Sequence, residues 1–138
     1  MQDRYKYRAK RLDNNEWYYG SYLYLHNADK FDWNGVRHST NEDVHYIIDE
    51  NDVNYAINPE TICQCTGIKD KNGKLIYEGD IVQILDDEIP YVVEYEQDRA
   101  MFIIHSKIDR VCCNFDNYSG YELETIDDIY ENTELIKD

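Results

Sequence analysis

Long apolar runs are absent from this chain, and no segment approaches the roughly 20 consecutive apolar residues that a membrane-spanning helix requires. The basic residues near the N-terminus are not followed by the apolar region of a secretory signal peptide. We therefore expect a soluble, cytoplasmic protein without membrane contact. In that compartment its four cysteines are expected to remain reduced thiols.

Positive charge is also scarce, because 14 Lys and Arg residues stand against 29 Asp and Glu residues and give a formal net charge of −15. Such a charge argues against direct binding to the phosphate backbone of a nucleic acid. The few bases cluster at the N-terminus, as Arg4, Lys6, Arg8, Lys10 and Arg11. We expect this strip to pair with the acidic half of the same fold. The alternative is that this strip, with its interleaved Tyr5 and Tyr7, contacts another subunit or a single-stranded nucleic acid.

Apolar residues make up 42% of the 138 residues, which is enough for one compact domain, or for a small barrel with an N-terminal extension, without a disulfide or a metal. Tyrosine is the abundant aromatic residue, with 14 copies against three Phe and two Trp. Tyrosine suits half-buried pleated surfaces, so the composition indicates a β-rich protein. A tyrosine-lined binding face is the alternative interpretation.

The N-terminal half contains a predicted hairpin. Residues 4–11 alternate between apolar and basic side chains, which is typical of a half-buried strand, and residues 17–26 read as its returning partner with Gly20 as a candidate bulge. Residues 27–43 show little pattern and are expected to form a long loop. Short strands are then predicted over residues 44–49 and 53–57.

The C-terminal half contains many short predicted strands separated by turns. These strands are expected over residues 61–68, 74–77, 81–85, 90–96, 100–105 and 110–115. The clearest turn is at residues 70–73, where Asn72-Gly73 supplies the positive φ angles of a tight hairpin. Residues 121–130 fit a strand or, by the spacing of their apolar residues, a short helix, and Asn132 is a candidate cap for a last helical turn. This pattern predicts a mainly β fold, either a small barrel or a sandwich.

Residues 58–85 read NPETICQCTGIKDKNGKLIYEGDIVQIL. Together with KYRA at residues 6–9, WYYG at 17–20 and IYEN at 129–132, this stretch resembles the YopX family of phage and prophage proteins. Two departures, Cys63 and Cys65, stand where the family commonly has a small and an aromatic residue. The resemblance implies an N-terminal β-hairpin region and loop over residues 1–58 and an SH3-type β-barrel over residues 59–138. It also implies a phage or prophage origin and frequent self-association, and it implies no activity.

No motif predicts a metal, a cofactor or a catalytic centre. Cys63 and Cys65 would point to the same side of a strand, and neither pair of cysteines has the spacing of a zinc knuckle. We therefore expect buried thiols. A metal site that combines cysteine with histidine remains an alternative, and the four histidines that could contribute to it are scattered along the chain: His26, His38, His45 and His105. Lys74 is followed by Leu75, so residues 67–75 do not match a phosphate-binding loop. Neighbouring acids are expected to form solvated faces, as at Asp86-Asp87, Asp127-Asp128 and Glu122 with Glu124.

The predicted function is that of a non-enzymatic interaction module, which binds its own copies as a homo-oligomer, or binds host or phage proteins, inside a bacterial cell. One alternative is an acidic mimic of nucleic acid, because alternate carboxylates on a strand lie roughly 6–7 Å apart, as for Glu94 with Glu96 and Glu122 with Glu124. The remaining alternative is a small metal-dependent or Cys-His enzyme.

Overall fold

The computed structural model describes residues 3–31, 34–35, 37–84, 89–106, 112–114 and 122–132, with side chains for all of these except 4, 26–31, 37–42 and 112–114. The protein is mainly β with almost no helix, which confirms the predicted class. In the described part of the chain, no helix combines the length and the apolar character needed to cross a membrane. The chain divides into two compact units, Lys6–Ile62 and Met1–Tyr5 with Cys63–Asp138, which we call the ribbon unit and the sheet unit.

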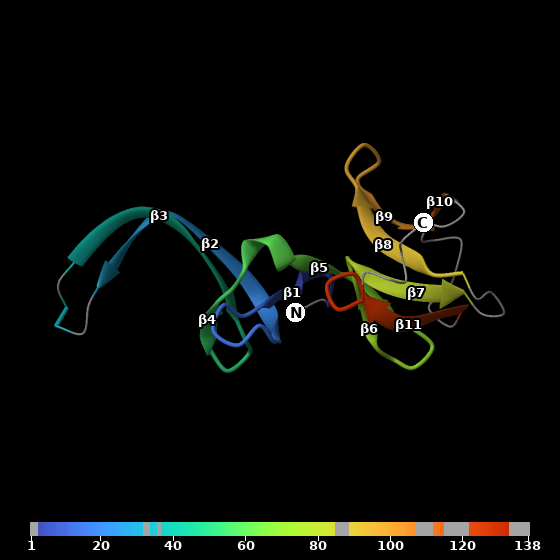
Figure 1. The fold of residues 1–138 in the computed structure, drawn as a ribbon, viewed down its shortest axis with the longest axis horizontal. Coiled ribbons are helices and arrows are strands. Elements are labelled where there is room, and N and C mark those ends of the chain that lie inside the picture. Colours follow the sequence, from blue (N-terminus) through green and yellow to red (C-terminus); the bar gives the residue numbers. More distant parts are fainter. Residues whose placement is uncertain are drawn as a thin grey trace. The chain divides into compact units, whose positions relative to one another are not determined.

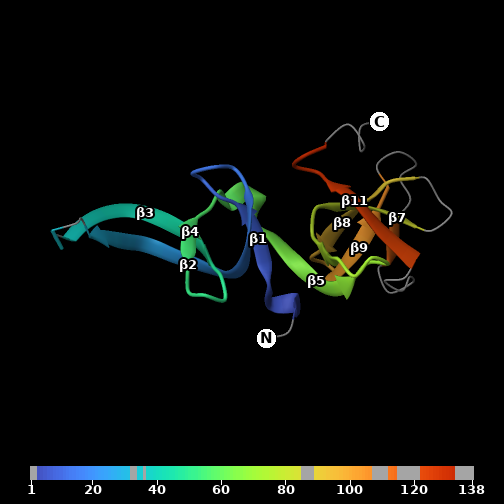
Figure 2. The same ribbon diagram turned by 90° about the horizontal axis from the view of Figure 1, so that it is seen from below.

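The ribbon unit is built on one long antiparallel hairpin (Figures 1 and 2). Its elements are β1 (Tyr7–Lys10), β2 (Trp17–Phe31), β3 (Arg37–Ile48), β4 (Asn54–Ala56) and the 3-10 turn η2 (Pro59–Thr61). β2 pairs with β3. The shorter β1 pairs with residues 17–20 of β2, and β4 pairs with residues 46–48 of β3, so both lie at the inner end of the hairpin, far from Phe31 and Arg37. The residues that follow β1 and β4 meet at a bridge between Arg11 and Ile57. The small core of this unit consists of Ala9, Ile47 and Ile57.

The sheet unit contains the 3-10 turn η1 and seven strands. These are η1 (Asp3–Tyr5), β5 (Cys63–Lys69), β6 (Leu75–Tyr77), β7 (Asp80–Ile84), β8 (Tyr91–Glu96), β9 (Met101–His105), β10 (Cys112–Asn114) and β11 (Leu123–Asp128). β5 and β6 form a hairpin, and the other five strands form an antiparallel sheet in the order β10-β9-β8-β7-β11. The strands that the structure describes form no closed barrel, so the SH3-type arrangement stays a prediction.

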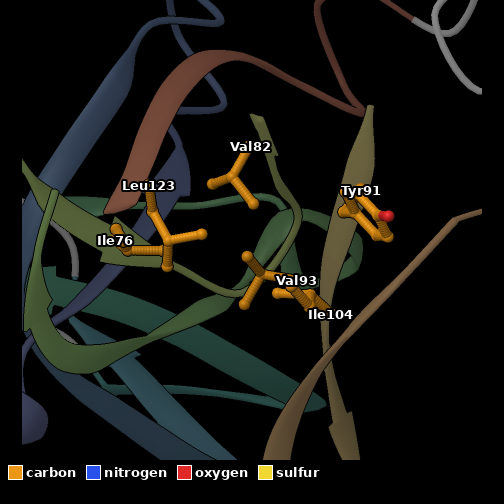
Figure 3. Packing of buried hydrophobic residues seen from close by; sticks show 6 residues of the cluster. All are labelled: Ile76, Val82, Tyr91, Val93, Ile104 and Leu123. Atoms are coloured by element: carbon orange, nitrogen blue, oxygen red, sulfur yellow. The ribbon is translucent and has the colours of Figure 1, made fainter. Parts of the chain in front are cut away.

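The core of the sheet unit comes from alternate residues on neighbouring strands. Six buried side chains point toward one another in Figure 3: Ile76, Val82, Tyr91, Val93, Ile104 and Leu123. Ile81, Val92 and Ile103 alternate with these on β7, β8 and β9 and are also buried, so both faces of the sheet are covered at its centre. Because burial of such a side chain stabilises by about 1.5–3 kcal/mol, this core is the main source of stability in the unit.

The predicted turn at residues 70–73 is confirmed, and a buried carboxylate organises it. One oxygen of Asp70 accepts hydrogen bonds from the backbone N–H groups of Asn72 and Lys74, at 2.9 and 3.0 Å. The other oxygen accepts from the N–H of Thr125 on β11, at 3.0 Å. Burial alone would raise the pKa of Asp70, but these donors outweigh burial and lower it. Asp70 thus ties the hairpin to a strand 55 residues away.

The prediction of a long loop over residues 27–43 is wrong. β2 continues to Phe31 and β3 begins at Arg37, and their pairing extends outward to Phe31 opposite Arg37. The register shifts between Leu25 and Ala28 and again between Ala28 and Asp29. Such irregularities break the alternation of apolar and polar residues, which is why the sequence shows no strand pattern there.

Residues 121–130 form a strand over Leu123–Asp128 and not a helix. The register of β11 against β7 shifts between Thr125 and Asp127, so a bulge at Ile126 changes the spacing of the apolar residues. That change explains why their spacing resembles a helical period. The predicted helical turn after Asn132 lies outside the described residues.

Gly20 is needed for close packing, and the register of β1 with β2 shows no bulge up to Gly20, whose pair with Tyr7 is the last one. A Cβ atom at this position would lie 2.1 Å from the carbonyl oxygen of Ile48. Only glycine lets the end of β3 come so near to β2.

We predict that Asp70→Asn lowers the free energy of unfolding at pH 7 by about 1–3 kcal/mol, because the amide nitrogen cannot accept from the donors that the carboxylate oxygen binds. Because the pKa of Asp70 is lowered in the folded protein, its contribution to the free energy of unfolding is complete above the pKa of an unfolded Asp, near 3.9. This contribution is lost as the pH falls through the pKa of the folded state. Denaturant titrations from pH 7 to pH 3 should therefore show that the difference in unfolding free energy between wild type and variant becomes smaller as the pH falls. The exposed turn residue Asp98 provides the control Asp98→Asn, and a constant difference at every pH would contradict the prediction.

Gly20→Ala should lower the free energy of unfolding by about 1–3 kcal/mol, because the added methyl group forces β2 and β3 apart. The midpoint of chemical denaturation, read by the tyrosine signal, measures this change. Ser21→Ala next to it is the control and should have little effect, and equal midpoints for the two variants would refute the role of Gly20.

Candidate functional site

The β2–β3 ribbon has two chemically different faces, because side chains alternate along each strand. The first, the tyrosine face, consists of Tyr18, Tyr22 and Tyr24 of β2, His45 of β3 and Tyr55 of β4. The second, the leucine face, consists of Tyr19, Leu23 and Leu25 of β2 with Val44 and Tyr46 of β3. The two faces differ in how far their groups are already engaged within the chain.

On the tyrosine face, His45 lies between two rings. The hydroxyl of Tyr22 shares a hydrogen bond of 2.5 Å with Nδ1 of His45, and the two rings are stacked with centroids 5.9 Å apart. The ring of Tyr24 lies 4.9 Å from that of His45, and its hydroxyl donates to the carboxylate of Asp43 at 2.9 Å. Tyr7 of β1 continues the row, with its ring 5.7 Å from Tyr22.

The hydroxyls of Tyr22 and Tyr24 stay protonated well above neutral pH. Burial, followed by the nearby Tyr7, raises the pKa of Tyr22. The hydrogen bond to Asp43, followed by burial, raises the pKa of Tyr24. Both phenols are therefore neutral at physiological pH.

A second cluster on the tyrosine face anchors the inner end of the ribbon. The guanidinium of Arg11 lies 3.5 Å from the ring centroid of Tyr55 and binds Asp13 at 2.5 Å. Tyr18 packs edge-on against Tyr55, with centroids 5.0 Å apart, and donates to the carboxylate of Asp49. Burial and the bond to Asp49 raise the pKa of Tyr18 to about 12. These contacts are internal, so this face holds the ribbon together and its groups are engaged within the chain.

Both faces expose large side chains, since Tyr24 on the tyrosine face is 47% exposed, but only the leucine face exposes aliphatic side chains of β2. Tyr19 is 46% exposed, Leu23 39% and Leu25 40%. These residues lie on the same side of one strand, where Leu23 and Leu25 are neighbours and Ser21 separates them from Tyr19. Exposed apolar strips on a sheet are typical of protein–protein contact. The leucine face is therefore the candidate functional site.

The basic N-terminal strip is not an exposed basic surface. Arg8 and Lys10 are buried, with 2% and 6% exposure, which corrects the expectation of a half-buried strand with its charged side in water. Both cationic groups lie over the ring of Trp17, at 4.4 and 5.3 Å from its centroid. Arg11 pairs with the nearby Asp13 and not with the acidic C-terminal half. The strip therefore does not offer these three cations to a nucleic acid.

The candidate thiols and imidazoles do not converge in the part of the chain that the structure describes. Cys63 and Cys65 are free and fully buried on β5, as expected for structural thiols. His45 belongs to the tyrosine face, and Nδ1 of His105 lies 3.6 Å from a carboxylate oxygen of Glu94 in the sheet unit. Among the described residues, no group of three or more His, Cys, Asp or Glu side chains could hold a metal ion. The side chains of His26, His38, Cys112 and Cys113 lie outside the described set.

Two of the candidate carboxylates, Glu96 and Glu124, are paired with cations. Glu94 faces His105, and Glu96 binds Arg99 at 3.1 Å. On β11, Glu124 binds Lys71 at 3.2 Å. Burial, followed by repulsion from Glu94, raises the pKa of Glu78. Asp86 and Asp87 lie outside the described residues. These pairings reduce the exposed negative charge on which a nucleic-acid mimic depends.

Sequence reasoning identified the strand at residues 17–26 but not the leucine face as a site. The signal was present, because no Asp, Glu, Lys or Arg occurs between Glu16 and Asp29 in a chain that is 31% charged. With residues 27–43 read as a loop, the predicted strand ended at residue 26, and its leucines were not considered as a surface.

Comparison with known proteins supports the family resemblance. A model of the family described as YopX protein matches residues 6–137. The crystal structure of YopX from Bacillus subtilis has a TM-score of 0.50 with this chain at 20% sequence identity, and the match covers 97% of this chain and 99% of that chain. At this identity the likeness shows a shared fold. No curated protein matches the chain. Because the family model spans nearly the whole sequence, the chain belongs to the YopX family.

Proposed function

We propose that this protein is a non-enzymatic interaction module that associates with its own copies through the apolar side chains of β2. The observation that carries the proposal is the exposure of Tyr19, Leu23 and Leu25 along one side of that strand. An origin in phage or prophage genomes, a place in the bacterial cytoplasm and an SH3-type C-terminal unit complete the proposal by family resemblance.

Strand geometry supports association through the ribbon. β1 pairs with residues 17–20 of β2 and β4 with residues 46–48 of β3. Among the described residues, 21–31 and 37–45 therefore form a ribbon of only two strands. A two-stranded ribbon is marginally stable in water unless a further strand or a packed face supports it. Burial of the leucine face in a partner would supply that support.

Charge supports the choice of the ribbon unit as the contact. Residues 6–62 carry six Lys and Arg against ten Asp and Glu, a net charge of −4, whereas the remainder of the chain carries eight against 19, a net charge of −11. Two copies repel each other most strongly through their sheet units. The ribbon unit is therefore the part through which they approach at the lowest electrostatic cost.

Light scattering on the purified chain tests the proposal. We expect wild type at high concentration to exceed the 16.5 kDa of one chain, and the double variant Leu23→Asp/Leu25→Asp to return to that mass, because two charges would be buried in the contact. Leu12→Asp is the matched control, because Leu12 is 66% exposed and lies outside strands β2 and β3. This variant should associate like wild type. A wild-type protein that stays at 16.5 kDa at all concentrations refutes self-association.

A further inference from the structure

One edge of β2 changes its surroundings at Gly20. Up to that residue β2 lies between β1 and β3, and the last pair with β1 joins Gly20 to Tyr7. From residue 21 to residue 25 the register with β3 continues regularly along the opposite edge, from Ser21 opposite Ile48 to Leu25 opposite Val44. Among the described residues, no further strand of this unit continues β1 along residues 21–25.

Sheet edges of this kind pair readily with another strand, and proteins usually protect them with lysine, proline or bulges. Residues 21–25 read SYLYL and contain none of these protective features. The register shifts begin only after Leu25, and both prolines of the chain, Pro59 and Pro90, lie elsewhere. The segment is thus a short, regular edge of side chains that favour β-strands.

The edge also lies in the longest stretch of the chain without a charged residue, from Trp17 to Ala28. In a chain with a net charge of −15, a second copy can approach this stretch without bringing like charges into contact. This condition favours another copy of the same segment over a charged partner strand.

We propose that two copies of the chain pair edge to edge through residues 21–25, antiparallel, with the two-fold axis at Leu23. This inference rests on the proposed self-association and specifies its geometry. Leu23 is the midpoint of the segment between the end of β1 and the first register shift, so this register pairs residues 21–25 of both copies. Beyond Leu25 the two β2 strands must diverge, because Gly20 of the second copy is already paired with Tyr7 of its own chain. The two β2–β3 ribbons then form one sheet in the order β3-β2-β2-β3, which is a two-fold symmetric contact.

The proposed register matches side chains of like character. Leu23 lies opposite Leu23 of the second copy, and Ser21 lies opposite Leu25, all on the leucine face. Tyr22 lies opposite Tyr24 of the second copy, so the tyrosine and histidine row continues from one ribbon into the other. Because only five residues pair, we expect a dimer that depends on concentration.

Disulfide cross-linking tests this register in the full chain, on a background in which Cys112→Ser and Cys113→Ser remove two thiols. Cys63 and Cys65 are fully buried and stay in place. Under mild oxidation Leu23→Cys should form a cross-linked dimer on a non-reducing gel, because residues at the axis face each other within the 4.4–6.8 Å that a disulfide spans between Cα atoms. Leu25→Cys is the matched control and should not cross-link to itself, because its two copies would lie about 14 Å apart along the strands.

A mixture of Ser21→Cys and Leu25→Cys chains provides a second readout that leaves Leu23 intact, and it should yield a mixed dimer. Equal self-linking by Leu23→Cys and Leu25→Cys would overturn the register in favour of parallel pairing or face-to-face stacking. A wild type that scatters as a dimer while neither Leu23→Cys nor the mixture cross-links would overturn edge pairing alone. A monomeric wild type would overturn the proposed function as well.

Discussion

The pairing of β2 with β3 is the constraint on which the ribbon unit depends. It joins residues as far out as Phe31 and Arg37, while β1 and β4 support only its inner end. A ribbon of this length needs stabilisation beyond its backbone hydrogen bonds. The tyrosine face supplies part of it, through the hydroxyl and ring contacts that join Tyr22 and Tyr24 to His45 and Asp43.

The same pairing determines where the molecule can make contacts. Contacts on the tyrosine face leave the opposite side of the strands, with Leu23 and Leu25, in water. In the sheet unit the situation is different, since Val92 and Val93 alternate on β8 and both are buried. The two units thus use similar strands in different ways. One covers the centre of its sheet on both faces, and the other leaves one apolar face exposed.

Much of the fold could be predicted from local chemistry. The turn at Asp70 and Gly73, the hairpin of β1 and β2 and the short strands of the sheet unit follow from turn residues and alternation. The outer ribbon could not be predicted in this way, because two register shifts near Ala28 destroy the alternation, and a bulge at Ile126 gave β11 a helical spacing. The burial of Arg8 and Lys10 was not predicted, because alternation places these basic side chains on one face of β1 but does not show that the ring of Trp17 on the neighbouring strand β2 lies against them.

The tyrosine face has a consequence for the behaviour of the ribbon unit in alkali. The pKa of Tyr18 is raised to about 12, and the pKa values of Tyr22 and Tyr24 are also raised. Tyrosines in an unfolded chain have a pKa near 10. The stability that these phenols contribute is complete below the pKa of the unfolded state and is lost as the pH rises through the pKa values of the folded state. All three belong to the ribbon unit, so strong base removes stabilising contacts of its tyrosine face. Phenolate formation would open the hairpin from its aromatic side, at a pH where the carboxylate of Asp70 still holds its turn in the sheet unit.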